Sequence, residues 1–499
     1  MWLTRSGPTR TSVKLPTILA IGFSGHRQLA DENKCRTAIR KVLEDWKAKV
    51  PGVIYCVSSA AAGGDLLFAE ACIEMNLPIR IFLPFPKESF RADFDELTWE
   101  RAELVMASAL SVEVKGVSRE SKEGYYECSI ETVQQSELLI ALWDGKHGRG
   151  LGGTADAVYF ALEQGRTIVW INSASGAIQY LNEKKELLRD PEMDFLNGLA
   201  DGPLKLPANT PEDLVQAWFT KVDERANHVA PQFRRLAAIP IFCTAAAALL
   251  SGRTAFTGEG VIWLWMGTVF AIMAAALPVV MRLTQRQITW TRLRTAAEIC
   301  RSCMALWQTP ALYDVVGPEV VPELAGMLMS LKYLKMSDQA ARQTSLDDFK
   351  RLYRGNRVQR QIVYFSSHAA LATRAVRRYQ ILIWAVVILA GAFNVWILSN
   401  AHGLHVWMPG RWKPELAFTA ASFFQIATVA GALLVVNDYE RRRDRYRELH
   451  RMLTQWDKQL DLSQTWPIVL RITSMVEKAL LAELIEWRSH IRNRKLPQK

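Results

Sequence analysis

The sequence is poor in cysteine and has none of the spacings in which cysteine organises a fold. Seven cysteines are spread over 499 residues, so the chain is not a disulfide framework. Cys300 and Cys303 form a single C-x-x-C pair with no second Cys/His pair at zinc-finger spacing, which argues against a structural zinc ion. We therefore expect reduced thiols, no metal site and no resident cofactor.

Positive charge is scarce in the first half of the chain, although the net charge of the whole is +11. Residues 1–230 carry 26 Lys and Arg against 32 Asp and Glu, whereas residues 231–499 carry 35 against 18. A protein that binds nucleic acid along its length spreads its basic residues, so we expect no direct nucleic acid partner. Residues 1–16 lack the apolar core of a cleavable signal, so we expect no secretory signal peptide.

Acidic and basic residues are absent from four apolar runs in the second half. These runs are residues 236–250, 261–281, 381–399 and 416–436. The last three are long enough to cross a hydrocarbon core of about 30 Å, and the first reaches across with Ser251 and Gly252. We expect four transmembrane helices in two hairpins. Carriers and proton pumps need ionisable groups at membrane depth, so their absence favours an anchor or a helix bundle that opens a pore on oligomerisation.

Arginines flank these runs on one side only. They precede the first and third runs and follow the second and fourth, while the two loops between paired runs hold three basic residues. The positive-inside rule then places both termini in the cytoplasm. A shift of 156 residues aligns Arg286 with Arg442 and Leu293 with Leu449, which suggests that one hairpin and its basic helix are a copy of the other.

The first half alternates short β-branched runs with helical patterns. Strands are predicted at residues 17–22, 53–57, 79–83, 111–114, 138–142 and 167–171, with helices between most of them. This alternation predicts a parallel sheet that is covered on both faces. Ligands of such sheets bind beyond the carboxyl ends of the strands.

Glycine-rich or polar segments follow four of the predicted strands. Glycines let the backbone approach a ligand, N–H groups at a helix start favour phosphate, and an arginine can clamp it. The candidate nucleotide-binding residues are Gly22, Ser24, Gly25, His26, Arg27, Ser58, Ser59, Gly63, Gly64, Asp65, Asp144, Gly152, Gly153, Thr154 and Asp156. The same residues also fit a structural role, with the glycines as turns and His26 and Asp65 as helix caps.

Three of these segments carry a family resemblance. The G-x-S-G-x-R turn at residues 22–27, the run at residues 58–65 and the Gly-Gly-Thr-Ala-Asp helix start at residues 152–156 resemble the SLOG superfamily. That Rossmann-like group includes LOG-type phosphoribohydrolases, the DNA-processing protein A family and the sensor part of certain TRP channels. LOG-type enzymes carry P-G-G-x-G-T-x-x-E with a catalytic glutamate. Here Ala157 stands in its place, Arg149 at the proline and Leu151 at the second glycine. The resemblance therefore implies ligand binding rather than hydrolysis.

The second half is similar in layout to SLATT domains, which are two-span effector modules found with SLOG domains in bacterial conflict systems. The expected domains are a SLOG-like sensor at 1–175, a connector with a helix at 176–230, a first hairpin with its cytoplasmic helix at 231–310, a cytoplasmic helical region at 311–370 and a second hairpin with its helices at 371–499. The resemblance implies a homo-oligomeric effector of antiviral defence in the bacterial inner membrane, gated by a nucleotide signal that another enzyme makes.

Two other classes of function stay open. A membrane-tethered hydrolase of nucleotide N-glycosidic bonds would need another carboxylate, such as Asp156 or Glu131, in place of the missing glutamate. A membrane adaptor would bind the signal and recruit a partner without forming a pore. Nucleotide hydrolysis and membrane conductance separate these three hypotheses.

Overall fold

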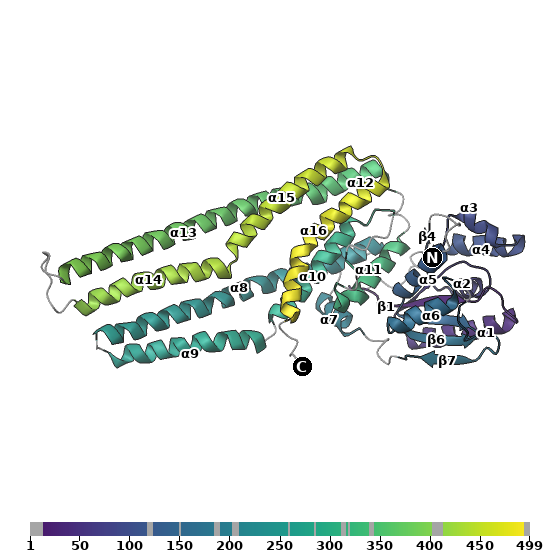
Figure 1. Cartoon of the computed structure of the whole chain (residues 1–499), viewed down its shortest axis with the longest axis horizontal. Helices are drawn as coiled ribbons and strands as arrows, with labels where there is room; N and C mark the ends of the chain where they lie inside the picture. The colour runs from purple at the N-terminus through teal and green to yellow at the C-terminus, as the bar shows by residue number, and fades with distance from the viewer. Residues whose placement is uncertain are drawn as a thin grey trace. The chain divides into compact units, whose positions relative to one another are not determined.

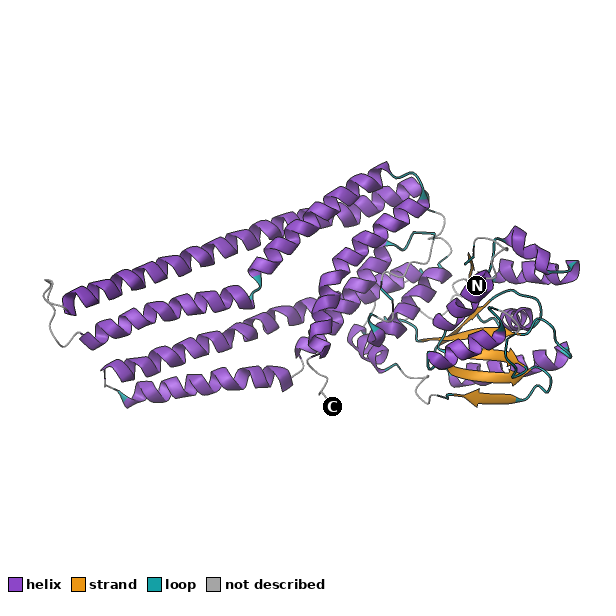
Figure 2. Cartoon of the chain, in the orientation of Figure 1, coloured by secondary structure: helices purple, strands orange, loops and turns teal. Residues whose placement is uncertain are grey.

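A computed structural model describes residues 13–116, 123–148, 151–183, 190–201, 209–257, 260–283, 286–310, 316–317, 320–338, 344–401 and 413–493 (Figure 1). The chain divides into two compact units. The first unit is Met1–Trp218 together with Val321–Ala340, and the second is Phe219–Val320 together with Ala341–Lys499. Strands occur in the first of these, and the described parts of the second are helical (Figure 2).

The first unit is built on a seven-stranded sheet with the strand order β4-β3-β2-β1-β5-β6-β7. The strands are β1 Ile18–Gly25, β2 Val53–Ser58, β3 Ile79–Leu83, β4 Ser111–Val114, β5 Leu138–Trp143, β6 Thr167–Asn172 and β7 Ile178–Leu181. β1 to β6 run parallel, and β7 pairs antiparallel with β6. The strand order reverses direction between β1 and β5, and this point is where ligands of open parallel sheets bind.

Helices cover both faces of the sheet. Those of the first unit are α1 Glu32–Lys49, α2 Gly64–Glu74, α3 Lys87–Phe90, α4 Glu96–Ser108, α5 Glu123–Gln134, α6 Thr154–Glu163, α7 Pro191–Ala200, the start of α8 Pro211–Thr257, and α11 Ala325–Ser337. Alternate residues of β5 belong to two different clusters. Ile140 packs in the cluster of α1, α2 and α4, and Ala141 packs with α6. A strand that is buried on both sides reads as a continuous apolar run, as β5 does.

The six predicted strands are confirmed, with two differences. β1 continues to Gly25 rather than ending at Gly22, because its ladder with β5 runs on to the pair Gly25–Leu142. A Cβ at Gly22 would lie 2.6 Å from Ser136 Oγ, so this glycine lets the strand pass the end of α5. The second difference is β7, which starts in the predicted connector as an antiparallel edge strand after a turn at Gly176.

Four helices are long and apolar enough to cross a membrane. They contain Ala238–Ala255 of α8, Val261–Val280 of α9 Val261–Leu283, and the apolar parts of α13 Gln359–Ala401 and α14 Lys413–Val436. Large apolar side chains on these segments face outward, with Trp265 69% and Ile388 65% exposed. The four apolar helices that the sequence predicts are thus present, and they are consistent with a membrane protein.

The other helices of the second unit are polar on one side and pack through buried contacts. They are α10 Arg286–Ala305, α12 Leu346–Tyr353, α15 Tyr439–Leu462 and α16 Trp466–Asn493. A π-helical turn, Arg354–Val358, joins α12 to α13. From this turn Arg357 reaches the fully buried Glu477 of α16, with Nη2 donating to Oε2 at 2.6 Å. Tyr353 also donates to Glu477, at 2.9 Å. The turn therefore ties α13 to α16.

Candidate functional site

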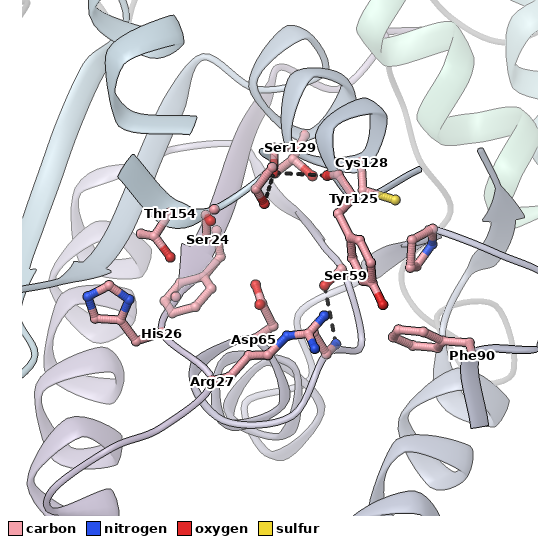
Figure 3. Close-up of a pocket in the computed structure, with 17 residues that line it drawn as sticks. Ser24, His26, Arg27, Ser59, Asp65, Phe90, Tyr125, Cys128, Ser129 and Thr154 are labelled. Atoms are coloured by element: carbon pink, nitrogen blue, oxygen red, sulfur yellow. Dashed lines mark hydrogen bonds between the residues drawn. The ribbon is translucent and has the colours of Figure 1, made fainter. Parts of the chain in front are cut away.

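A cavity of about 210 Å³ opens at the carboxyl edge of the sheet, at the ends of β1 and β5 (Figure 3). Segments from the end of β1, the β2–α2 loop, the residues after β3, α5 and the start of α6 surround it. The lining residues are Phe23, Ser24, Gly25, His26, Arg27, Ser59, Ala61, Asp65, Pro84, Phe90, Tyr125, Cys128, Ser129, Thr132, Gly152, Gly153 and Thr154. The strand order places this cavity where a parallel sheet presents its ligand site.

Nine of the fifteen candidate residues line the cavity. They are Ser24, Gly25, His26, Arg27, Ser59, Asp65, Gly152, Gly153 and Thr154. The other six do not line it, and they are Gly22, Ser58, Gly63, Gly64, Asp144 and Asp156. All of these except Gly22 make contacts, described next, that position lining residues.

Glycines bring the end of β1 against the start of α2. A Cβ at Gly63, whose φ is +88°, would overlap the carbonyl oxygen of Arg27, and a Cβ at Gly64 would lie 3.0 Å from the Cα of Gly25. The N–H of Gly64 donates to the carbonyl of His26 at 2.9 Å. These glycines are needed for backbone contact, and that contact fixes the wall from which Arg27 and Asp65 extend.

Asp65 is the one carboxylate among the described lining residues. Its side chain is buried in the first turn of α2, and Ser58 Oγ donates to its Oδ1 at 3.1 Å. Burial raises the pKa of Asp65 to about 7, although the hydrogen bond from Ser58 and the charge of Arg27 oppose the shift. Near neutral pH this group therefore exists both as a carboxylate that accepts hydrogen bonds and as an acid that donates one.

Arg27 lies beside an aromatic and acidic pair. Its guanidinium lies 4.9 Å from the centre of the Tyr125 ring, and Nη2 lies 3.5 Å from Asp93 Oδ2. The Tyr125 hydroxyl donates a short hydrogen bond to the same oxygen, and burial, followed by the Asp93 contact, raises the pKa of Tyr125. Arg27 is still 48% exposed. It is oriented by stacking, with donors left for an anion.

His26 joins the end of β1 to the end of β5. Its Nε2 accepts a hydrogen bond from the N–H of Asp144 at 3.0 Å and lies 3.1 Å from Asp144 Oδ1. The backbone N–H of Lys146, followed by His26, holds the pKa of Asp144 below its usual range. Asp144 thus positions His26 and the β5 loop rather than lining the cavity.

The opposite wall is the start of α6. Gly152 has a φ of +84°, and its N–H donates to Asp156 Oδ2 at 2.7 Å. Ser129 Oγ of α5 donates to the carbonyl of Gly152 at 3.1 Å. The N–H groups of Thr154 and Ala155 lie in the first turn of α6, where helices leave donors without intrahelical acceptors. Asp156 therefore shapes the loop, and the helix start is the part that faces the cavity.

One side of the cavity comes from α5, which was not among the sequence predictions. Tyr125, Cys128, Ser129 and Thr132 recur at helical spacing and line one side of the cavity. That spacing was a usable signal, because residues three, four and seven apart share one helix face. Phe90 was also missed, and it lies at the end of the short helix α3 with no pattern to mark it.

The two carboxylates considered as substitutes for the missing glutamate lie outside the lining. Asp156 is engaged with Gly152, and Glu131 lies 3.4 Å from Lys115. Ala157 is fully buried within α6, while Arg149 lies outside the described residues. No group of three or more His, Cys, Asp and Glu in the described ranges is arranged to hold a metal ion.

Two comparisons with known proteins found no match for this chain. No family model matches the sequence, and no curated protein matches it either.

Proposed function

We propose that the protein is a membrane effector gated by a nucleotide signal that binds in the first unit. The observation that carries the proposal is the cavity between the ends of β1 and β5, whose lining includes both Arg27 and the start of α6. A Rossmann-like domain of the SLOG kind fits this sheet, and its role would be sensing rather than metabolism, because Ala157 stands where LOG-type enzymes carry their glutamate.

The chemistry of the cavity suits a sugar phosphate. Arg27 and the first-turn N–H groups of α6 favour a phosphate, and Asp65 and Ser24 can bond ribose hydroxyls. At about 210 Å³ the cavity is smaller than the roughly 300–1,000 Å³ of sites that enclose a whole small molecule. It therefore takes the ribose phosphate, and the rest of a cyclic oligonucleotide or an ADP-ribose derivative extends outside.

In the second unit, four spans in two hairpins with cytoplasmic termini form the effector part of this proposal. The outward-facing apolar side chains are suited to lipid. A Cβ at Gly391 or at Gly431 would meet nothing within 4 Å, so both positions leave room for the close approach of a helix from another copy. The proposed effector action is a homo-oligomeric SLATT-like pore, or disruption of the bacterial inner membrane, in antiviral defence.

Calorimetric titration of the full chain in detergent tests the binding step. A panel of ADP-ribose, cyclic ADP-ribose, cyclic di-AMP and AMP should contain at least one ligand, and Arg27→Ala should weaken its binding about 10–100-fold, as expected for a lost charged hydrogen bond. Arg40→Ala is the matched control, because Arg40 pairs with Glu74 on the surface and does not line the cavity. Equal loss in both variants, or no binding by the wild type, contradicts the proposal.

A second candidate is a hydrolase of nucleotide N-glycosidic bonds, and Asp65 is the observation that favours it. With a pKa of about 7, the buried carboxyl can take a proton from water. That water would add to the anomeric carbon while the N-glycosidic bond breaks and the base leaves. Chromatography of nucleotides after incubation would show a free base that Asp65→Asn no longer releases. If a nucleotide binds and no free base appears, the hydrolase hypothesis fails and the sensor hypothesis stands. If a nucleotide binds and causes no membrane leakage, the protein would be an adaptor.

A further inference from the structure

Helix α11 lies between the second and third apolar spans in the sequence but belongs to the first unit. The chain leaves the first unit within α8, passes through α9 and α10, and returns as Val321–Ala340 before α12 begins. This excursion is unusual, because sequential elements commonly remain neighbours in a fold. In the sequence, α11 is therefore followed and preceded by segments of the second unit, which contains the apolar helices.

α11 is seated on the face of the sheet that carries α5 and α6. Tyr55 of β2 points away from its neighbours Ile54 and Cys56, which pack in the cluster of α1 and α2. The Tyr55 hydroxyl lies 3.6 Å from Met336 Sδ, and its ring centre lies 6.3 Å from that of Tyr333. Leu331 and Leu334 of the helix are buried. These contacts form an extensive surface within the first unit, and we call this surface the seat of α11.

A hydrogen bond connects this seat with α5, which lines the ligand cavity. Lys332 Nζ of α11 donates to Oε1 of Gln135 at 2.5 Å, directly after the last turn of α5. α5 is the helix whose Tyr125, Ser129 and Thr132 line the cavity. A ligand that displaces α5 therefore acts on the seat of α11 through a rigid helix of twelve residues, whose first turns touch the ligand site.

Buried polar atoms in and around the seat lack hydrogen-bond partners. Among the described residues, Ser330 Oγ of α11 is buried without one, and so are Nε and Nη1 of Arg80, whose Nη2 pairs with Glu113. Such groups are rare in folded proteins, because each loses its hydration and gains nothing in return. A seat with unsatisfied polar atoms is held less firmly than an apolar one, as expected of an element that must be released.

We infer that α11 is the element through which occupancy of the cavity reaches the membrane spans, and that the signal acts by releasing α11 from the sheet. This inference rests on the proposed nucleotide-gated function. Gating of this kind requires that the signal bind the released arrangement more tightly than the seated one. It follows that weakening the seat must strengthen binding, whereas fixing the seat must weaken it.

Two changes in the full chain test this inference. Leu331→Ala removes buried apolar contact from the seat without touching the cavity, and should raise the affinity for ADP-ribose, or for whichever panel nucleotide binds the wild type, about 3–10-fold. It should also lower the nucleotide concentration that causes dye leakage from liposomes by the same factor. Cysteines at positions 135 and 332, joined by a bismaleimide, should lower the affinity and abolish the leakage. Each single-cysteine variant, treated with the same reagent, is the control.

The outcomes separate the two proposals. Binding by the wild type together with a lower affinity of Leu331→Ala means that α11 only supports the fold, and this overturns the inference while nucleotide sensing stands. Leakage that survives the Gln135–Lys332 crosslink has the same meaning. If the wild type binds no nucleotide of the panel, the proposed function fails and the inference fails with it.

Discussion

The two units differ in where their long helices and their sheet place large apolar side chains. In the first unit the large apolar side chains lie inside, in clusters on both faces of the sheet. In the second, apolar side chains of the long helices lie outside, for instance Trp384 at 66% exposed, while the other helices bury apolar side chains such as Phe349 together with one ion pair, Arg357 and Glu477. The hydrophobic effect explains the first arrangement in water. The second is stable only where the surroundings of those helices are themselves apolar.

The buried ion pair of the second unit should give the largest effect. Glu477→Ala leaves Arg357 buried without its charge partner, and breaking a buried pair in this way costs about 3–5 kcal/mol of folding free energy. Thermal unfolding of the full chain in detergent measures the loss. Arg351→Ala is the control, since its pair with Asp348 is exposed and such pairs contribute about 0–1 kcal/mol. A similar effect of both substitutions would mean that the interior is not sealed from water.

A pair of equally exposed positions on α13 sharpens the comparison between water and lipid. Ile388, which is 65% exposed, lies in the apolar run, and Val363, which is 66% exposed, lies ahead of it. A lysine at the centre of a span costs about 2.5–3.5 kcal/mol on insertion scales. Ile388→Lys should therefore reduce the fraction that resists alkaline extraction from membranes, and Val363→Lys should not. Equal extraction of both variants would place the whole helix outside the bilayer.

Asp65, a buried acid of the first unit, makes stability fall with rising pH. Folding raises the pKa of Asp65 to about 7, so between about pH 4 and pH 7 the folded state binds a proton that the unfolded state has lost. Stability declines across this window and levels off above it. Asp65→Asn keeps the shape of the side chain but does not titrate. At pH 7.5 its free energy of unfolding should therefore exceed that of the wild type by about 1–4 kcal/mol. Denaturant unfolding at pH 4.5 and pH 7.5 measures the gain, and an equal difference at both pH values would contradict it.

Replacing a glycine by alanine should give the smallest difference in unfolding free energy between the two units. At Gly63 an alanine would have a φ of +88° and overlap the Arg27 carbonyl, which should cost about 1–3 kcal/mol. At Gly391 an added Cβ meets nothing within 4 Å, so Gly391→Ala should leave the unfolding free energy unchanged or raise it by about 0.5–1 kcal/mol. Denaturant titration of both variants tests this. A large loss at Gly391 would show that another helix already packs there.

The sequence was enough to predict the six parallel strands and the four apolar helices, because each has a period or a length that local chemistry dictates. It was not enough to place α11, since the pattern of a helix shows which of its faces is buried but not which surface covers it. The cavity was predicted in part. Arg27, Asp65 and Thr154 follow predicted strands, so their place in the site could be predicted. Phe90 could not be predicted, because it reaches the site only through the tertiary packing of α3.

Dye leakage from liposomes that hold the full chain tests the central claim, that occupancy of the cavity between β1 and β5 opens the membrane. Addition of the nucleotide panel should release dye from wild-type liposomes with a sigmoidal dependence on one nucleotide. Arg27→Ala should shift that dependence about 10–100-fold to higher concentration, while Arg40→Ala follows the wild type. Leakage that is the same with and without every nucleotide, or that Arg27→Ala does not shift, would contradict the claim.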